Sequence, residues 1–334
     1  MRILAMLSFC AALAASCGNH AGPQVEPPPP PPADERPAFD QARAFADLQA
    51  QVDFGPRVPG TQAHADCLQF IIDHVTDAGG RVVLSEFTAT TPLVPDEQSY
   101  TNVLGVFGED KAGEVLMLAA HWDSRAKADH DPDPAKRNQP VPAANDGASG
   151  VAVLLEIARG FAEQAPPRTV ILAFFDAEDQ GMTGSGLPLS GFAVGSRHLA
   201  GNWPDTAPWP DEMILLDLVG QDNVHNPAVG LPGWSNDVFD LPEERYSVDN
   251  APDLVDRVWS VGERLGHSAF QRRVRSAISD DHVPFQEAGV EAIDIIDFAP
   301  PEWHTTHDTP ENCDPASLYQ VGDTLLEFIY AERP

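Results

Sequence analysis

One stretch of the chain, residues 114–150, restricts the possible folds more than any other. It starts with an unbroken apolar run over 115–120, which predicts a strand buried on both faces of a sheet. The chain then turns polar at His121 and Asp123, and a loop rich in proline and aspartate leads to Asp146, where an amphipathic helix is expected to begin. Ligands of open α/β sheets lie outside the carboxyl ends of the strands. The stretch therefore predicts a metal site at a strand end.

The other apolar runs extend this pattern into a whole domain. Helices and strands alternate from residue 148 onward, as in a parallel sheet with helical crossovers. The first two strands have no helical pattern between them, so we expect them to form an antiparallel edge. This order predicts a three-layer α/β/α domain with a mixed, mostly parallel central sheet. Strands are expected at 81–87, 101–107, 114–120, 169–175, 213–219 and 292–296, and helices at 39–52, 61–79, 151–161, 253–265 and 317–329.

The N-terminus differs in composition from the rest of the chain. Residues 1–17 hold an apolar run too short to span a bilayer, followed by small residues before Cys17, which predicts a signal peptide of the bacterial lipoprotein type. Plain secretion stays open, because Ala14 stands where such signals usually carry Leu. Residues 18–36 contain an unbroken proline run and predict a stiff tether. We therefore expect a folded domain over 37–334, exported to the bacterial envelope or periplasm and bound to a membrane only through a lipid.

Charge and cysteine content exclude two kinds of function. The chain has 20 Lys and Arg against 51 Asp and Glu, a formal net charge of −31, which argues against nucleic-acid binding. Past the signal only Cys67 and Cys313 remain, and two buried free thiols are favoured over a disulfide between them. No CxxC pair occurs, so a zinc site built from thiolates is excluded.

Acidic residues and histidines recur at the ends of the predicted strands. Glu178 and Asp179 follow one strand, Asp217 lies among Leu and Val in another, and Asp280 and His304 come later. A single Asp at such a place is usually a turn or cap residue. A carboxylate among apolar residues, however, is unfavourable unless it is paired or lies near a cation. Carboxylate oxygens and imidazole nitrogens in a small set suit Zn²⁺, so the series predicts a zinc centre.

The adjacent pair Glu178 and Asp179 suggests a division of roles within that centre. Successive side chains of an extended segment point to opposite sides. One carboxylate can therefore bind the metal while the other faces the substrate as a general acid and base.

Together these motifs resemble those of the zinc-dependent glutaminyl cyclases of the M28 peptidase clan, specifically their bacterial branch. The resemblance covers nearly all of the predicted domain and implies a zinc-aminopeptidase-like fold. It implies that the chain acts on a peptide or protein with an N-terminal Gln, converting that glutamine to pyroglutamate with release of ammonia. The motifs that carry it are Phe54–Pro59 with Ala63–His64 and Cys67, Ala120–Arg125, Asp131–Pro134, Ala144–Val151, Phe174–Asp179, Gly195–Ser196, Leu216–Asp217, Asp280–His282, and Trp303–Thr305 with Asp308–Thr309.

The resemblance also implies a metal site and a proton carrier. It implies one Zn²⁺ held by Asp146, Asp179 and His304, with Glu178 as the group that takes and returns a proton. Glu178 would thus act on the substrate directly, while its neighbour in sequence binds the metal.

Further residues receive expected roles around that centre. The resemblance implies that Asp217 and Asp280 form an acidic hydrogen-bonded pair behind the site, and that Trp303 is an aromatic wall for the substrate side chain. His121 and His282 could bind a second metal or orient neighbouring groups, and for His282 we favour the second role.

Two other functions stay open. A zinc aminopeptidase of the same clan uses two zinc ions to remove N-terminal residues, and the chain has the ligand types for it: His121, Asp146, Asp179, Asp217 and His304. An Asp rather than a Glu at position 179 and the loop 126–144 favour the cyclase, whereas the run 180–185 resembles the aminopeptidases. A non-catalytic binding lipoprotein is disfavoured, because Glu178 and every expected ligand are present. We expect a monomer.

Overall fold

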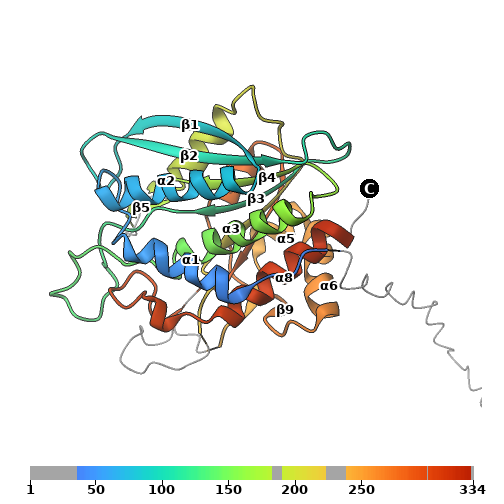
Figure 1. Ribbon diagram of the computed structural model, residues 1–334. Helices are drawn as coiled ribbons and strands as arrows, with labels where there is room; N and C mark the ends of the chain where they lie inside the picture. The colour runs from blue at the N-terminus through green and yellow to red at the C-terminus, as the bar shows by residue number, and fades with distance from the viewer. Residues whose placement is uncertain (1–35, 183–189, 223–237, 299, 332–334) are drawn as a thin grey trace, which may run out of the picture. The chain divides into compact units, whose positions relative to one another are not determined.

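The core of the fold is a six-stranded sheet with the strand order β1-β2-β4-β3-β7-β10 (Figure 1). β1 is antiparallel to β2 and β2 to β4, whereas β3, β4, β7 and β10 run parallel to one another. The predicted mixed, mostly parallel sheet and its antiparallel edge are both confirmed. The strands are β1 (Arg81–Ala89), β2 (Gln98–Phe107), β3 (Leu116–His121), β4 (Val170–Phe175), β7 (Glu212–Asp217) and β10 (Glu291–Ile296).

This computed structural model describes residues 36–182, 190–222, 238–298 and 300–331. All of them belong to one compact unit, which spans residues 31–334. The predicted signal over 1–17 and the predicted tether over 18–36, apart from Arg36, lie outside the described residues.

Helices cover both faces of the sheet and complete the predicted three layers (Figure 1). α4 (Val194–Gly201) and α7 (His282–Glu287) pack on one face, and α5 (Arg245–Asn250) packs against β10 at the edge. The opposite face carries α1 (Gln41–Asp53), α2 (Gln62–Asp77), α3 (Ala148–Glu163), α6 (Pro252–Leu265) and α8 (Pro315–Ala331).

The central strands are buried along their whole length, which explains why their sequences are apolar without alternation. Every residue of β3, β4 and β7 is buried. Within β3, Leu116 and Leu118 pack in the core under α1 and α3, whereas Met117 and Ala119 pack in the core under α4 and α7. A strand covered by helices on both faces needs apolar side chains at successive positions.

Two short strand pairs lie outside the main sheet. β5 (Asp179–Met182) pairs with β6 (Ser190–Phe192), and β8 (Leu241–Glu243) pairs with β9 (Phe270–Val274). The sequence pattern did not predict them, because strands this short show too little periodicity. Both pairs lie next to segments that carry predicted site residues, since β5 begins with Asp179 and β9 precedes Asp280.

The start of α3 is tied to the end of β7. Ser149 Oγ donates to the Asn145 carbonyl (2.6 Å) and accepts from the Val219 N–H (3.1 Å), and Asn145 Oδ1 accepts from the Gly220 N–H (2.7 Å). Gly147 at the helix start has a φ of 95°, a conformation that favours glycine. These contacts hold Asp146, at the start of the helix, next to the end of β7.

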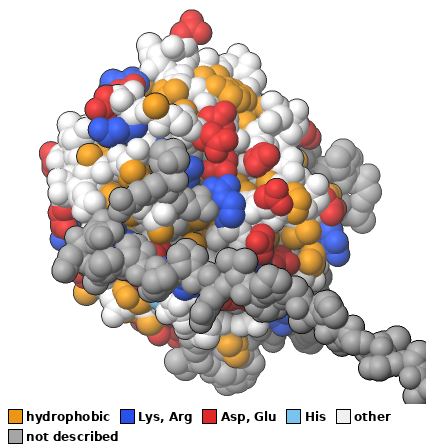
Figure 2. All heavy atoms as spheres, turned by 90° about the vertical axis from the view of Figure 1, so that its right-hand side faces the viewer, with side chains coloured by type: hydrophobic (Ala, Val, Ile, Leu, Met, Phe, Trp, Pro, Cys, Tyr) orange, Lys and Arg blue, Asp and Glu red, His pale blue; other side chains and the backbone are white. Residues whose placement is uncertain are grey.

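The surface is strongly acidic. On the face in Figure 2, acidic side chains lie among scattered hydrophobic ones, with fewer basic side chains beside them. In the part of the chain that the structure describes, no helix combines the length and the apolar character needed to cross a bilayer.

Cys67 and Cys313 are both free and buried, as the sequence favoured. Burial raises the pKa of the Cys67 thiol to about 12 and the pKa of the Cys313 thiol well above its usual range. Both side chains therefore act as small apolar groups of the core rather than as reactive thiolates.

Candidate metal centre and active site

The three predicted zinc ligands, together called the metal group, come together at the carboxyl edge of the sheet. Asp146 precedes α3, Asp179 opens β5 just after β4, and His304 lies in the loop after β10. Their donor atoms lie within 4.8 Å of one another, and all three side chains are buried. His304 Nε2 is 3.2 Å from Asp179 Oδ1 and 3.7 Å from Asp146 Oδ2.

Asp146 also lies against a second set of side chains that could bind a metal ion. Its Oδ1 lies 3.1 Å from His121 Nε2, and the same nitrogen lies 3.4 Å from Asp217 Oδ1. His121, Asp146 and Asp217 again offer donors within 4.8 Å of one another. Asp146 thus turns one oxygen to each group, as a carboxylate that bridges two metal ions would do.

Buried carboxylate oxygens that accept no hydrogen bond test whether a cation fits between these side chains. Within the described ranges, Asp146 Oδ2, Asp179 Oδ2 and Asp217 Oδ1 are buried and accept no hydrogen bond. A buried carboxylate oxygen left without a partner costs free energy, which a bound cation would remove. Oxygen and imidazole nitrogen donors in a buried set suit Zn²⁺, so the residues fit this metal.

The pKa values of these side chains also indicate that a bound cation would stabilise the buried carboxylates. Burial raises the pKa of Asp179 to about 7, although the positive charge of Arg125 opposes the change. Burial also raises the pKa of Asp217. The pKa of His304 falls to about 3, because burial and the charge of Arg125 disfavour the imidazolium. A neutral imidazole beside buried carboxylates, each with one oxygen that accepts no hydrogen bond, is the state that binds a cation.

Glu178 and Asp280 are two buried carboxyl groups whose pKa values are raised. Glu178 is only 9% exposed, and burial together with the negative charge of Asp280 raises its pKa well above the usual range. Burial and the charge of Asp217 raise the pKa of Asp280 in turn. A carboxyl group with a raised pKa can take a proton and return it near neutral pH.

Asp123 holds the backbone of the Glu178 and Asp179 pair. Its Oδ1 accepts from the Glu178 N–H (3.0 Å), and its Oδ2 accepts from the Asp179 N–H (3.3 Å) and from Gln180 Nε2 (2.8 Å). Its Oδ1 also lies 3.5 Å from His121 Nδ1. This buried carboxylate therefore orients both the acid-base segment and the imidazole of the second group.

Arg125 links two sides of the metal group, a role that the sequence did not reveal. Its Nη1 donates to Asp179 Oδ1 (2.9 Å), while Nε and Nη2 donate to the two oxygens of Asp129 (2.8 Å each). Asp129 Oδ1 in turn lies 3.8 Å from His304 Nδ1. Arg125 stood within a motif of the resemblance, but no spacing in the sequence indicated what its side chain contacts.

Asp308 is a second residue whose role the sequence missed. Its oxygens accept from the backbone N–H groups of Asn145 (2.7 Å) and Asp146 (3.0 Å). Burial and the negative charge of Asp146 raise the pKa of Asp308 to about 7. Asp308 thereby holds the main chain that presents the central carboxylate of the site.

Backbone strain is concentrated at the turns that present the site residues. Of the five non-glycine residues with positive φ in the described chain, three lie here: Ala177 (56°), Leu218 (51°) and His304 (56°). Ala177 precedes Glu178, and Leu218 follows Asp217. Such conformations cost about 1–3 kcal/mol each and persist where the surrounding structure imposes them, commonly at functional sites.

Trp303 and His282, the two remaining predicted residues, have different surroundings. Trp303 is half-buried and stacks on the His304 ring, with centroids 3.9 Å apart. His282 is fully buried in a different environment, with Nε2 3.5 Å from Glu244 Oε2 and Nδ1 3.9 Å from Asp294 Oδ2. His282 belongs to neither of the two metal-binding groups at Asp146.

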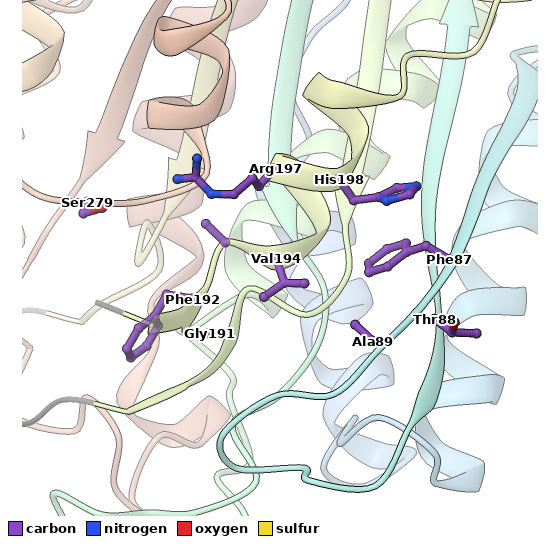
Figure 3. Close-up of a pocket in the computed structure, with 10 residues that line it drawn as sticks. Phe87, Thr88, Ala89, Gly191, Phe192, Val194, Arg197, His198 and Ser279 are labelled. Atoms are coloured by element: carbon purple, nitrogen blue, oxygen red, sulfur yellow. The ribbon is translucent and has the colours of Figure 1, made fainter. Parts of the chain in front are cut away.

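A cavity of about 390 Å³ is lined by residues of β1, β6 and α4 and by Ser279, and none of the candidate ligands lines it (Figure 3). β1 and α4 form two of its sides, where the Phe87 and His198 rings stack with centroids 4.4 Å apart. Ser279, next to Asp280 in sequence, also lines it. Phe192, which also lines the cavity, pairs with Asp179 between β5 and β6, so the cavity lies close to one candidate ligand.

Known proteins are similar to this chain in sequence and in overall structure. The crystal structure of Tannerella forsythia glutaminyl cyclase is 34% identical, with a TM-score of 0.79, over 89% of this chain and 100% of that chain. That of a leucine aminopeptidase precursor from Bacteroides thetaiotaomicron is 33% identical, with a TM-score of 0.78, over 89% of this chain and 98% of that chain. The glutaminyl-peptide cyclotransferase-like protein of Bos taurus is 27% identical over 300 residues, 82% of this chain and 71% of that protein.

A family match covers the segment that builds the site. Residues 102–329 match peptidase family M28, and this range runs from β2 into α8. It contains every candidate metal ligand, the carboxyl groups of Glu178 and Asp280, and the indole of Trp303. By this match, which spans more than half of its length, the chain belongs to peptidase family M28.

Proposed function

We propose that the protein is a zinc-dependent glutaminyl cyclase, which converts the N-terminal glutamine of a peptide or protein to pyroglutamate and releases ammonia. The observation that carries the proposal is Glu178, a buried carboxyl whose pKa is raised, placed directly beside Asp179 in the metal group. Similar structures described as bacterial glutaminyl cyclases support the same activity.

In this reaction some residues of the site bind the metal and another transfers the proton. Asp146, Asp179 and His304 would hold Zn²⁺, which when bound acts as a Lewis acid that polarises the γ-carbonyl of the glutamine. Ring closure is intramolecular, because the glutamine already carries its α-amine near its own γ-carbonyl. Glu178 accepts a proton from the α-amino group and returns one to the amide nitrogen. The bond between the α-nitrogen and the γ-carbon forms as the amide nitrogen leaves as ammonia.

Three further residues shape this step. Burial and the negative charge of Asp280 raise the pKa of Glu178, and burial and the charge of Asp217 raise the pKa of Asp280, so this environment keeps Glu178 basic enough to take the proton. The Trp303 ring, stacked on His304, would form an apolar wall along the aliphatic part of the glutamine side chain.

A zinc aminopeptidase is the second candidate, and one observation favours it. Asp146 turns one oxygen to His304 and the other to His121, as a carboxylate between two metal ions would. With two zinc ions, His121 and Asp217 would hold the second ion. The chain would then release the N-terminal residue of a peptide rather than cyclise it.

One experiment separates these functions. A peptide that begins with glutamine is incubated with the purified domain, and the products are identified by mass spectrometry beside the zinc content of the protein. Loss of one ammonia from the intact peptide, with about one zinc per chain, is the expected result. Release of free glutamine with about two zincs would show an aminopeptidase instead.

The variant Glu178→Gln tests the role of the proton carrier in the same assay. We expect turnover to fall by about 10²–10⁴-fold, because the amide cannot take up the proton, while the zinc content stays unchanged. Glu212→Gln is the matched control: Glu212 is a buried carboxylate at the opposite end of β7 that pairs with Arg168, away from the site. Full activity of Glu178→Gln would rule out the proposed mechanism.

We further propose, from the sequence alone, that the protein is an exported monomer with a lipid on Cys17. The support is the apolar run before Cys17 and the tether that follows it. Labelling cells with a fatty acid should mark the wild-type protein and leave Cys17→Ser unmarked, and light scattering of the purified domain should give the mass of one chain.

A further inference from the structure

The cavity in Figure 3 lies at the same edge of the sheet as the metal group. β1 points in the same direction as β4, because both strands are antiparallel to β2. Phe87 and Ala89, which line the cavity, lie at the end of β1. Thr101 pairs with Glu86 on β1 and donates its N–H to Asp176 Oδ2 (2.8 Å), just past the end of β4. The end of β1 is therefore level with the turn that follows β4 and leads to the metal group.

Two backbone hydrogen bonds tie the wall of the cavity to this turn. Ala193 and Val194 both line the cavity. The Ala193 N–H donates to the Glu178 carbonyl (3.0 Å), and the Val194 N–H donates to the Ala177 carbonyl (3.1 Å). Ala193 has a φ of 52°, a conformation that costs free energy and persists where the surrounding structure imposes it. The wall of the cavity thus lies directly against the backbone that presents Glu178.

The Phe192 ring brings the cavity next to a candidate metal ligand. Phe192 lines the cavity and pairs with Asp179 between β5 and β6. The Arg125 guanidinium, which donates to Asp179 Oδ1 (2.9 Å), has its central carbon 5.4 Å from the centroid of the Phe192 ring. The Cα atoms of paired residues lie about 4.5–5.5 Å apart, and successive Cα atoms of a peptide lie about 3.8 Å apart. A peptide whose first residue lies at the metal group therefore has its second and third residues within reach of the cavity.

The walls of the cavity suit an apolar side chain. Phe87, Val194 and Phe192 are among the residues that line it (Figure 3). The Phe87 ring is held by stacking on Tyr100 and on His198, with centroids 5.3 Å and 4.4 Å away. The cavity volume of about 390 Å³ falls within the range of about 300–1,000 Å³ that is typical of ligand pockets. An apolar side chain that enters loses its contact with water and gains aromatic neighbours.

The polar side chains of the cavity do not call for a charged occupant. Arg197 Nη1 donates to Glu287 Oε2 (2.7 Å), so the guanidinium already has an opposite charge beside it. Burial lowers the pKa of His198, so its imidazole is neutral at neutral pH. A charged side chain of a peptide would lose hydration here and meet no unpaired opposite charge among these residues.

We propose that the cavity binds the side chain of the second or third residue of the peptide substrate and favours a large apolar residue there. This inference rests on the proposed function of the metal group and adds a substrate class to it. The contacts in the cavity do not involve the reacting atoms, so they are equally strong before and during the chemical step. They should therefore lower KM and leave kcat nearly unchanged.

Three amidated peptides test this preference: Gln-Gly-Gly, Gln-Phe-Gly and Gln-Gly-Phe. Ammonia release is followed for each, and mass spectrometry identifies the pyroglutamyl product. We expect at least one of the two phenylalanine peptides to have a kcat/KM about tenfold above that of Gln-Gly-Gly, because burial of an aromatic side chain is worth at least this factor. The gain should lie in KM rather than in kcat.

The variant Ala89→Phe shows whether this preference arises in the cavity. Ala89 is half-buried at the end of the edge strand β1, where a larger side chain can extend into the cavity. We expect the preference for phenylalanine to fall below about twofold, while kcat/KM for Gln-Gly-Gly stays within about twofold of the wild type. Leu84→Phe is the matched control, because Leu84 is 43% exposed on the same strand and does not line the cavity. It should keep the full preference.

A smaller substitution covers the case in which Ala89→Phe does not fold. Ala89→Leu extends less far into the cavity and should reduce the preference for phenylalanine at least twofold, with kcat/KM for Gln-Gly-Gly again unchanged. A folded Ala89→Leu protein with the full wild-type preference would count against the cavity.

The outcomes separate this inference from the proposed function. No ammonia release from any of the three peptides by the wild-type protein would reject the function, and this inference with it. Cyclisation of all three peptides with equal kcat/KM, or a preference for phenylalanine that Ala89→Phe leaves unchanged, would overturn the role of the cavity alone.

Discussion

At the level of single residues, the metal site depends on side chains that hold its ligands as much as on the ligands. Arg125 joins Asp179 to Asp129, and Asp308 holds the backbone of Asp146. Groups that orient metal ligands affect metal affinity strongly, because a ligand that moves must be reordered when the metal binds.

Arg125→Lys should therefore weaken zinc binding. Lysine keeps the positive charge but cannot donate to Asp179 and to both oxygens of Asp129 at once. We expect zinc affinity to fall by about ten- to a hundredfold, measured by competition with a chromophoric chelator. Arg81→Lys, which alters an exposed pair with Glu109, is the control and should leave the affinity unchanged. Equal affinities for Arg125→Lys and the wild type would show that the Arg125 geometry is not needed.

A second prediction at this scale concerns pH and Asp323 on α8. Although burial opposes the change, the hydrogen bond from His267 and the charge of Arg36 lower the pKa of Asp323. Asp323 therefore stabilises the fold above the pKa of the unfolded chain, about 3.9, and this stabilisation is lost as the pH falls through the folded pKa. Denaturant unfolding should show Asp323→Asn less stable than the wild type at pH 7, with a difference that shrinks below about pH 4. A difference that grows on acidification would contradict the assignment.

At the level of elements, the site requires α3 to approach the sheet closely. A Cβ at Gly150 would lie 2.5 Å from the Leu216 carbonyl oxygen on β7 and 2.9 Å from Ala120 Cβ on β3. The absence of a side chain there lets the start of α3 come near the ends of both strands. This approach brings Asp146 next to His121 and Asp217.

Gly150→Ala should consequently destabilise the protein, since the Leu216 carbonyl on β7 and the Ala120 side chain on β3 must move. We expect a loss of about 1–3 kcal/mol in the free energy of unfolding, measured by denaturant titration. Gly201→Ala is the matched control at the end of α4, where a Cβ would meet nothing within 4 Å, and its stability should be unchanged or slightly higher. Equal stabilities for the two variants would show that the close approach is not a constraint.

At the level of the whole molecule, metal binding and stability should be linked. The carboxyl edge of the sheet gathers buried carboxylates, and the chain as a whole carries a net charge of −31. A cation bound only by the folded state stabilises it, by about 2.7 kcal/mol when the free metal is a hundredfold above its dissociation constant.

A chelator should accordingly lower the melting temperature of the wild-type protein, and added zinc should restore it. The variant His304→Ala removes one expected ligand and serves as the control, because its melting temperature should respond much less to the chelator. Calorimetry of both proteins with and without chelator makes the comparison. A wild-type melting temperature that does not change on complete zinc removal would contradict a metal bound by the folded state.

The sequence determined the layers, the antiparallel edge, the strand ends near Asp179 and Asp217 and the helix start at Asp146, because these follow from local periodicity and the order of elements. It also indicated both buried thiols. It did not reveal Arg125, Asp308 or the short pairs β5–β6 and β8–β9, whose contacts join segments far apart in the chain.

Only the tertiary structure decided which polar groups meet. Hydrophobic runs specify strands and helices through neighbours a few residues away, so they can be read directly from the sequence. The contact of Glu244 with Ile278 and His282, and the place of Asp146 between two groups of donors, depend on how several elements pack together. Such contacts are set by distances in space between residues that have no fixed spacing in the sequence, and packing alone brings them together.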